Sequence, residues 1–216
     1  MFSFLSMDSK FMQILSRFTD LVLLNLVYLM TCLPVFTIGA ANAALYRVCF
    51  QLFRQQEDRI FQDYFRAFRD NFKQGTVLWL LWLLVCLPGS FYVLQFLGMA
   101  SPLRYLCGIF FFVILLAVFL GCWAFPWISQ FRNDTITVLR NTLILSISHL
   151  PRTVCVMAIQ LLPWAMMLFF PELFLKISFL WFALYFSAAA FVITAILWKV
   201  FRPFYPEEAT QEHTTA

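Results

Sequence analysis

The chain has 216 residues and a mass of 25.4 kDa, the size of one ordinary domain. Apolar residues make up 62% of it and charged residues 12%, against about 45–50% and about 25% in soluble domains. Because so few charged side chains cannot cover a surface in water, the composition excludes a soluble globular protein. It also excludes a disordered chain and a disulfide scaffold, and the net charge of +4 is too small to indicate nucleic-acid binding. We therefore predict an all-α, polytopic membrane protein.

Residues 1–20 precede the first long apolar segment and mix apolar with polar side chains. Phe4, Phe11, Leu15 and Phe18 follow a mostly helical spacing, with Arg17 among the polar residues between them. This pattern predicts either an amphipathic helix lying in the membrane interface or an ordinary leading segment.

Five segments without charged residues are long enough to cross a bilayer, which takes about 20 residues. They are predicted at about residues 21–46, 75–97, 105–131, 153–171 and 177–198, within one transmembrane domain of residues 21–202. None is long enough to cross twice, so we expect an odd number of spans and termini on opposite faces. The polar tail of residues 203–216 is predicted to be disordered.

Lys and Arg divide unequally between the two faces that this topology defines. Eleven of the fifteen lie on the face that carries the segments 47–73 and 132–152 and the C-terminus. Because cytoplasmic loops carry the excess of cations, we predict a cytoplasmic C-terminus and an external N-terminus. A signal peptide cleaved near Ala41-Asn42-Ala43 is the alternative, but it would place the cations of residues 47–73 outside.

The first cytoplasmic segment contains phenylalanines at spacings of three and four, which predicts an aromatic stripe on a helix. The candidate contact residues are this stripe and the cations beside it: Phe61, Phe65, Arg66, Phe68, Arg69, Phe72 and Lys73. The stripe can lie on the inner leaflet, dock on a partner protein or pack against the protein's own spans, and the sequence leaves these three readings open.

A second amphipathic helix is predicted in the segment of residues 133–152. Asn133-Asp134-Thr135 offers capping side chains. The apolar residues that follow are again spaced by three and four: Ile136, Leu139, Leu143 and Ile147. We expect this helix to end near His149, with Pro151 in the opening turn of the next span.

Four of the five predicted spans contain a proline, which removes one helical hydrogen bond (Pro34, Pro88, Pro126 and Pro163). Broken helices mark substrate sites in many transporters, so Pro34 and Pro88, with the amides Asn25 and Asn42, are candidates for a solute path. Each also has an ordinary explanation, since transmembrane helices tolerate proline and use amides to bond neighbouring helices. No span interior contains Asp, Glu, Lys, Arg or His, which argues against a proton-coupled pump and favours neutral solutes.

The sequence contains no recognised catalytic or metal-binding constellation. Its two histidines and six cysteines do not stand at metal-ligand spacings, and no P-loop, G-x-S-x-G or H-E-x-x-H motif occurs. His149 with Arg152 and Asp134 is the one polar cluster worth examining near the cytoplasmic face. We expect no catalytic residue, no cofactor and no metal, and a protein that is not an enzyme.

Three blocks of sequence resemble the YesL family of bacterial membrane proteins. They are residues 25–46, which include CLPVFTIGA, residues 61–74, which include FRAFRDNFKQ, and residues 125–152, which end in HLPR. The resemblance covers roughly residues 11–205. It implies a bacterial inner-membrane protein with a domain of unknown function, and no catalytic residue carries over because the family has no established activity.

Many members of the YesL family are associated with gene clusters for carbohydrate uptake by ABC transporters. The resemblance therefore implies an accessory or regulatory component beside such a permease. The alternative, from the kinked spans, is a small transporter or channel for neutral solutes. The expected partners are the lipid bilayer, sugar permease subunits and further copies of this chain, but no nucleic acid.

Overall fold

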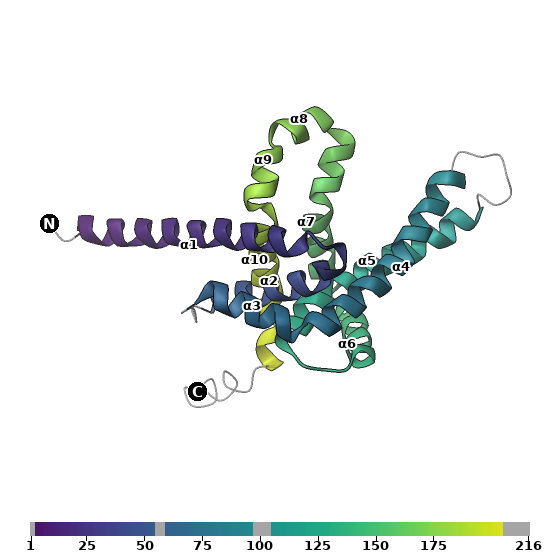
Figure 1. Ribbon diagram of the computed structural model, residues 1–216, viewed down its shortest axis with the longest axis horizontal. Coiled ribbons are helices and arrows are strands. Elements are labelled where there is room, and N and C mark those ends of the chain that lie inside the picture. The colour runs from purple at the N-terminus through teal and green to yellow at the C-terminus, as the bar shows by residue number, and fades with distance from the viewer. Residues whose placement is uncertain (1–2, 55–58, 97–104, 205–216) are drawn as a thin grey trace.

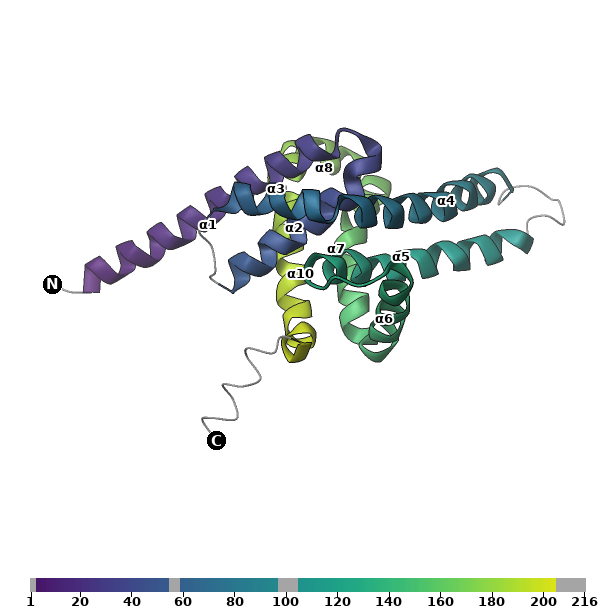
Figure 2. The same cartoon turned by 60° about the horizontal axis from the view of Figure 1, so that its bottom comes forward.

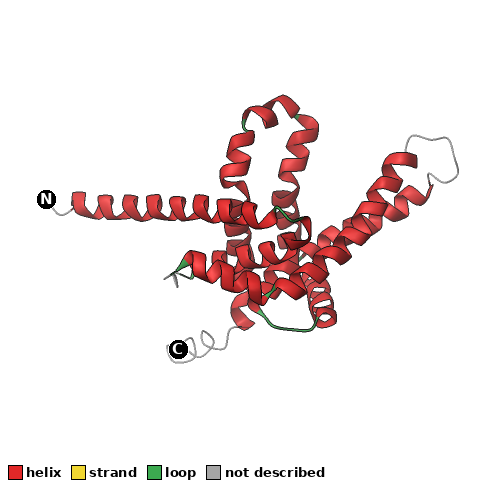
Figure 3. Cartoon of the chain, in the orientation of Figure 1, coloured by secondary structure: helices red, strands yellow, loops and turns green. Residues whose placement is uncertain are grey.

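The computed structural model describes residues 3–54, 59–96 and 105–204, with the backbone alone for residues 3–14. Every regular element in these ranges is helical and none is a strand (Figures 1 and 3), which confirms the all-α class. Six helices are long and apolar enough to cross a membrane, by length and composition: residues 15–32, 35–53, 72–96, 106–130, 150–169 and 178–204. The chain is thus a multi-pass membrane protein with one more candidate span than the sequence predicted.

The extra helix arises because the predicted span of residues 21–46 is two helices. α1 (Ser3–Cys32) ends before Pro34, and after the turn η1 (Val35–Thr37) the chain continues as α2 (Ile38–Phe53). Pro34 has φ −76° and ψ 116°, an extended conformation that a helix does not contain. Two helices of this length arise from one charge-free segment because both run past their flanking charges, α1 back beyond Asp20 and α2 on beyond Arg47.

The helix α1 also absorbs most of the predicted interfacial segment of residues 1–20, since it is continuous from Ser3. After α2 the chain forms α3 (Ile60–Asp70), α4 (Phe72–Phe96), α5 (Leu106–Gln130) and α6 (Thr135–Ser148). It then forms α7 (Leu150–Phe169), α8 (Pro171–Lys176), α9 (Ser178–Leu180), the π-helical turn η3 (Trp181–Tyr185), α10 (Phe186–Phe201) and η4 (Arg202–Phe204). Of the predicted tail, residues 205–216 lie outside the described residues.

The prolines have unequal effects on these helices. Pro88, Pro126 and Pro163 lie inside α4, α5 and α7, and each helix is continuous through its proline. Pro151 stands in the first turn of α7, as predicted, where its missing N–H is not needed. Of these five prolines, Pro34 therefore separates two helices of the candidate membrane region.

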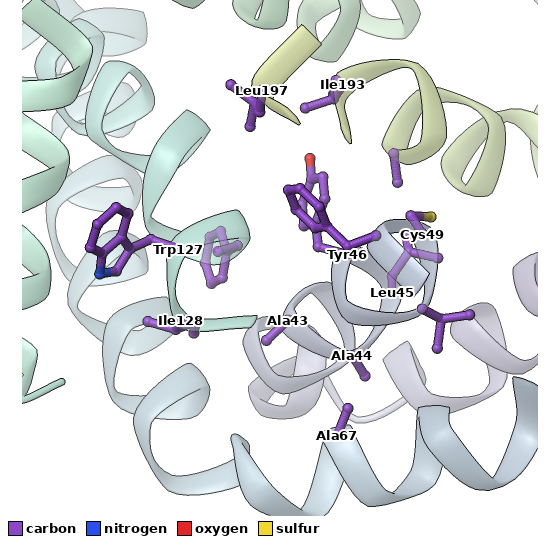
Figure 4. Packing of buried hydrophobic residues seen from close by; sticks show 14 of the residues in the cluster. Ala43, Ala44, Leu45, Tyr46, Cys49, Ala67, Trp127, Ile128, Ile193 and Leu197 are labelled. Atoms are coloured by element: carbon purple, nitrogen blue, oxygen red, sulfur yellow. The ribbon is translucent and has the colours of Figure 1, made fainter. Parts of the chain in front are cut away.

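The helix α2 forms the centre of the molecule. In its apolar segment 67% of the residues are buried, against at most 33% in the other candidate spans. Figure 4 shows Tyr46 of α2 between Ile193 of α10 and Trp127 of α5, with Ala67 of α3 on the other side of the helix. Small residues along α2 permit this enclosure: Gly39, Ala40, Ala41, Ala43 and Ala44 are all buried.

The closest approach is the crossing of α2 and α4 at two glycines. A Cβ atom on Gly39 would lie 2.1 Å from the carbonyl oxygen of Gly75, and one on Gly75 would lie 2.8 Å from the backbone nitrogen of Ala40. The indole of Trp79 in α4 donates a 2.7 Å hydrogen bond to the Val35 carbonyl next to this crossing. These contacts hold the turn after α1 against the beginning of α4.

Three arms leave this centre in different directions (Figures 1 and 2). They are α1 toward the N-terminus, the α4–α5 hairpin, and the hairpin in which α7 and α10 are joined through α8 and α9. The arms expose large apolar side chains, among them Leu84, Leu94, Ile109, Leu168 and Phe179. Such surfaces are unfavourable in water and are covered by lipid in a membrane.

Candidate functional site

The helix α3 packs on α1 and α2 through residues that lie beside the predicted phenylalanine stripe. Tyr64 and Ala67 are its buried residues, and Phe68 is partly buried against the same core. Phe61 and Phe65 are 45% and 52% exposed. Phe72, which begins α4 and was predicted on the same stripe, is also exposed. Only one of the four phenylalanines therefore packs inward.

A buried tyrosine holds α3 on α1. The Tyr64 hydroxyl lies 2.6 Å from Thr31 Oγ1, and Thr31 Oγ1 donates to the Tyr28 carbonyl at 2.9 Å. Because the one hydroxyl proton of Thr31 is used in that bond, Tyr64 is the donor to Thr31. Burial raises the pKa of the Tyr64 phenol well above its usual value, and the bond to Thr31 lowers it by less. The phenol therefore stays protonated at physiological pH and the bond persists.

The outward face of α3 combines aromatic side chains with cations. A shallow groove there is lined in part by six of the predicted contact residues, which we call the α3 surface: Phe61, Phe65, Arg66, Arg69, Phe72 and Lys73. All six are exposed in the described chain. The seventh predicted residue, Phe68, lines the same groove but stacks on Tyr64 with ring centres 6.5 Å apart.

The helix α6 shows the same arrangement. It packs on α5 through residues adjacent to its predicted stripe (Val138, Thr142, Leu145 and Ser146), and the stripe itself is exposed (Ile136, Leu139, Leu143 and Ile147). The two segments that were predicted to be cytoplasmic meet, because Asp70 at the end of α3 forms a 2.9 Å ion pair with Arg132. Gln74 Nε2 also donates a 2.6 Å hydrogen bond to the Asn133 carbonyl. Most side chains of both apolar stripes are thus exposed within the described chain.

The polar cluster predicted around His149 does not assemble. Asp134 precedes α6 and His149 follows it, so the length of the helix, about 21 Å for 14 residues at 1.5 Å each, separates them. The His149 ring stacks instead near Trp123, with ring centres 6.1 Å apart. No group of three potential metal-ligating side chains occurs among the residues with described placement.

A cavity of about 400 Å³ lies beside α2, lined by α1, α2, α4, α5, α7, α8, η3 and α10. Its wall is mainly aromatic and aliphatic, with contributions from Trp79, Trp82, Phe125, Trp164, Phe174 and Phe186. No Asp, Glu, Lys, Arg or His belongs to the described lining. An ion would enter it without a counter-charge, so the cavity suits an uncharged ligand.

Two side-chain pairs supply four of the polar side chains that line the cavity. Tyr28 donates a 3.0 Å hydrogen bond to Asn42 Oδ1, and Gln160 Nε2 lies 3.4 Å from the Tyr46 hydroxyl. Asn42 and Tyr46 are four residues apart on α2, so both pairs share one face of that helix. The Nδ2 amide of Asn42 donates to no other described residue. We call Tyr28, Asn42, Tyr46 and Gln160 the polar patch.

The four residues predicted for a solute path separate in the structure. Asn42 lines the cavity. Asn25 is buried between α1 and the start of α10, where it binds backbone atoms. Pro34 lies in the turn between α1 and α2, and Pro88 is exposed on α4 away from the cavity lining.

Sequence reasoning missed most of the cavity wall. Tyr28, Tyr46 and the tryptophans read as ordinary apolar residues of a span, since nothing in their spacing distinguishes a cavity wall from a packed core. Asn42 and Tyr46 at a four-residue spacing are the one pattern that could have indicated a shared polar face. The partner Gln160 lies 114 residues beyond Tyr46, which no local pattern reveals.

Residues 21–88 match the model of a family described as "Protein of unknown function, DUF624". YesL family proteins are in this family, so the resemblance is confirmed. The matched segment runs from α1 to Pro88 in α4 and contains the Pro34 turn, the Gly39–Gly75 crossing and the α3 surface. No curated protein and no solved structure matches the chain significantly.

Proposed function

We propose that this chain, with its DUF624 segment, is an accessory or regulatory component of the bacterial inner membrane that docks on an ABC-type carbohydrate permease. The observation that supports docking is the α3 surface, whose aromatic side chains are left exposed by the other described parts of the chain. The choice of a sugar permease as partner rests on the family resemblance. The proposed role is binding and regulation, and it includes no catalytic step.

The composition and support of the α3 surface suit a protein partner. Aromatic and arginine side chains dominate the binding energy of many interfaces. Tyr64 anchors α3 on α1 from behind, so little conformational freedom is lost when a partner binds. The cations Arg66, Arg69 and Lys73 predict a partner face that combines apolar side chains with acidic ones.

Affinity purification from native membranes in mild detergent, followed by mass spectrometry, tests this proposal. We expect permease subunits in fixed proportion with the wild-type chain. Recovery of the permease subunits should fall at least about tenfold for the double variant Phe61→Ser, Phe65→Ser. A tenfold loss corresponds to about 1.4 kcal/mol of binding free energy. Phe68 is left intact because it packs on Tyr64, and its loss would disturb α3 itself.

Phe36→Ser is the matched control, since Phe36 is 51% exposed in η1 and lies outside the α3 surface. It should leave recovery unchanged. Permease recovery that is equal in the α3 variant and the wild type would reject the docking surface. Purification of the wild-type chain without any permease subunit would reject the accessory role.

The proposed orientation places α3, α6 and the C-terminus in the cytoplasm and the N-terminus outside. It requires an odd number of crossings, so one of the six candidate helices does not cross. We assign this role to α2, because a residue near its start and another just past its middle both contact the same end of the α4–α5 hairpin. Gly39 lies against Gly75 in the first turn of α4, and Arg47 donates a 2.9 Å hydrogen bond to the Ser129 carbonyl in the last turn of α5.

The second candidate function is a small transporter or channel for neutral solutes, acting as an oligomer. The cavity beside α2 supports it, because the described lining contains no Asp, Glu, Lys, Arg or His. The purified chain in liposomes should then carry neutral solutes, and Asn42→Leu should slow the flux. Absence of flux across a broad panel of sugars and polyols would reject this candidate.

A further inference from the structure

We propose that the cavity beside α2 binds one uncharged amphiphile from the bilayer. Its hydrocarbon part would lie against Trp79, Trp82 and Phe125, and its hydroxyl or carbonyl group would bind the polar patch at Asn42. This inference concerns the cavity that supports the second candidate function, and it requires binding but no transport.

The size and charge of the cavity limit the ligands that it can bind. A volume of about 400 Å³ falls within the range of small-molecule sites, roughly 300–1,000 Å³. A phosphate, carboxylate or ammonium group would lose its hydration there without an opposite charge, because no Asp, Glu, Lys, Arg or His belongs to the described lining. The ligand is therefore a small molecule without net charge.

The distribution of polar atoms in the cavity wall further limits the chemistry of the ligand. Both amide side chains and two of the tyrosine hydroxyls gather at the polar patch, where the Asn42 Nδ2 donor is unused and the 3.4 Å contact between Gln160 and Tyr46 is long for a hydrogen bond. A free sugar would turn several hydroxyl groups toward the aromatic wall without partners, which is unfavourable. A plain hydrocarbon would leave Asn42 without an acceptor. A hydrocarbon with one small uncharged head group satisfies both regions.

The aromatic wall is preorganised for an acyl chain. The rings of Trp79 and Trp82 are stacked with centres 5.1 Å apart and 11° between their planes. The hydrogen bond from Trp79 Nε1 to the Val35 carbonyl fixes the first of these rings. The two indoles thus present a fixed apolar surface beside the cavity.

The cavity reaches the membrane-facing surface of α7. Trp164 and Met167 line it and are 65% and 53% exposed. Both lie in the candidate span of residues 150–169, so the route into the cavity leads through lipid and not through water. This position favours a bilayer amphiphile over a water-borne solute.

Tryptophan fluorescence of the full chain in phosphatidylcholine nanodiscs tests the inference, since three tryptophans line the cavity (Trp79, Trp82 and Trp164). The probe is a monoacylglycerol with a dibrominated chain, because bromine quenches indoles that it contacts. We expect saturable quenching that monooleoylglycerol reverses. An oleoyl lysophosphatidate, which adds a phosphate to the same molecule, should compete at least tenfold less well. Glucose in the aqueous phase should not compete.

Two glycines of α5 give a matched pair of variants. A side chain on Gly121 enters the cavity, because a Cβ there would lie 3.4 Å from Trp82 Nε1, whereas a Cβ on Gly108 meets nothing within 4 Å. Gly121→Leu should abolish the saturable quenching and Gly108→Leu should leave it intact. Asn42→Leu, which keeps the cavity open, should weaken binding about tenfold.

Quenching that rises linearly with probe and is equal in Gly121→Leu and the wild type would overturn the inference. So would equal competition by the lysophosphatidate. Competition by glucose would assign the cavity to a water-borne sugar and reject the amphiphile. Binding of the probe without solute flux in liposomes would support the inference and reject only the transporter function. The failure of the binding site and the failure of the transporter function can therefore be distinguished.

Discussion

At the scale of single residues, Asn25 shows how one amide joins two helices. Its Nδ2 donates a 2.6 Å hydrogen bond to the Phe182 carbonyl, and its Oδ1 accepts a 3.0 Å bond from the Ser187 backbone N–H. These two backbone groups are five residues apart and flank the end of the π-helical turn η3. The amide therefore bridges a carbonyl and an N–H that the helix leaves apart.

Asn25→Leu should destabilise the protein by about 1–3 kcal/mol, because it leaves a buried carbonyl and a buried N–H without partners. Thermal unfolding in detergent measures the effect as a lowered midpoint. Gln95→Leu, at an exposed amide of α4, is the control and should change the midpoint little. An equal midpoint for both variants would contradict the bridging role of Asn25.

Asn25 and Asn42 also show what residue type alone can predict. Both are amides in the same predicted span, and the sequence allows each to bond a helix or to contact a solute. Their roles separate because the partners of Asn25 lie 157 and 162 residues away, on α10 and the turn before it. Asn42 bonds Tyr28, only 14 residues away, and keeps one amide group toward the cavity.

At the scale of elements, the crossing of α2 and α4 depends on glycine. Gly39→Ala and Gly75→Ala each place a methyl group where backbone atoms already lie, and we expect each to cost about 1–3 kcal/mol or more. Gly108→Ala adds the same methyl group in open space and is the matched control. Thermal midpoints of the three variants check the prediction. Full stability of Gly39→Ala would show that the helices do not approach this closely.

The attachment of α3 gives a second prediction at this scale. Tyr64→Phe removes the bond to Thr31 and should weaken the attachment by about 1 kcal/mol. Hydrogen exchange of the α3 amides should then accelerate about fivefold, while exchange in α5 stays unchanged. Uniform acceleration in both helices would show global destabilisation and contradict a local anchor.

The raised pKa of Tyr64 extends this prediction to pH. The folded protein binds the phenol proton more tightly than the unfolded chain does, so its contribution is complete below the usual tyrosine pKa of about 10 and is lost as the pH rises further. The difference in hydrogen exchange of the α3 amides between the wild type and Tyr64→Phe should not change between about pH 6 and pH 9. A decline within that range would show that the phenol ionises and is not buried.

Both amphipathic helices were predictable as elements, but their orientation was not. The three-and-four spacing of the phenylalanines correctly indicates a helix at α3. It does not indicate that Tyr64 and Ala67 would face the core while most of the stripe stays exposed, because that choice depends on the shape of α2. The same holds for α6, which meets α5 through Val138 and Leu145.

At the scale of the whole molecule, the proposed orientation predicts which termini a membrane-impermeant maleimide reaches. In a cysteine-free background, Ser3→Cys should be labelled on intact cells and Thr214→Cys only after lysis. If neither cysteine is labelled on intact cells, the number of crossings is even. That result would reject the assignment of α2 as a helix that does not cross. Labelling of Thr214→Cys on intact cells would reject the cytoplasmic C-terminus.

The sequence by itself determined the class of this protein. A chain that is 62% apolar, with charges confined to a few segments and long charge-free runs between them, is suited to helices in lipid, since each helix satisfies its own backbone hydrogen bonds. The segments predicted from composition and charge-free length also overlap α4, α5, α7 and α10, and the residues of the α3 surface were predicted from local spacing.

Only the tertiary structure decided the division at Pro34, the central place of α2 and the cavity beside it. A proline is compatible with a continuous helix, as Pro88 shows, or with a turn, as Pro34 shows, and the surrounding contacts select between them. The cavity joins residues of α1, α2, α4, α5, α7 and α10. Its chemistry exists because helices far apart in the chain pack together, and local periodicity carries no information about that packing.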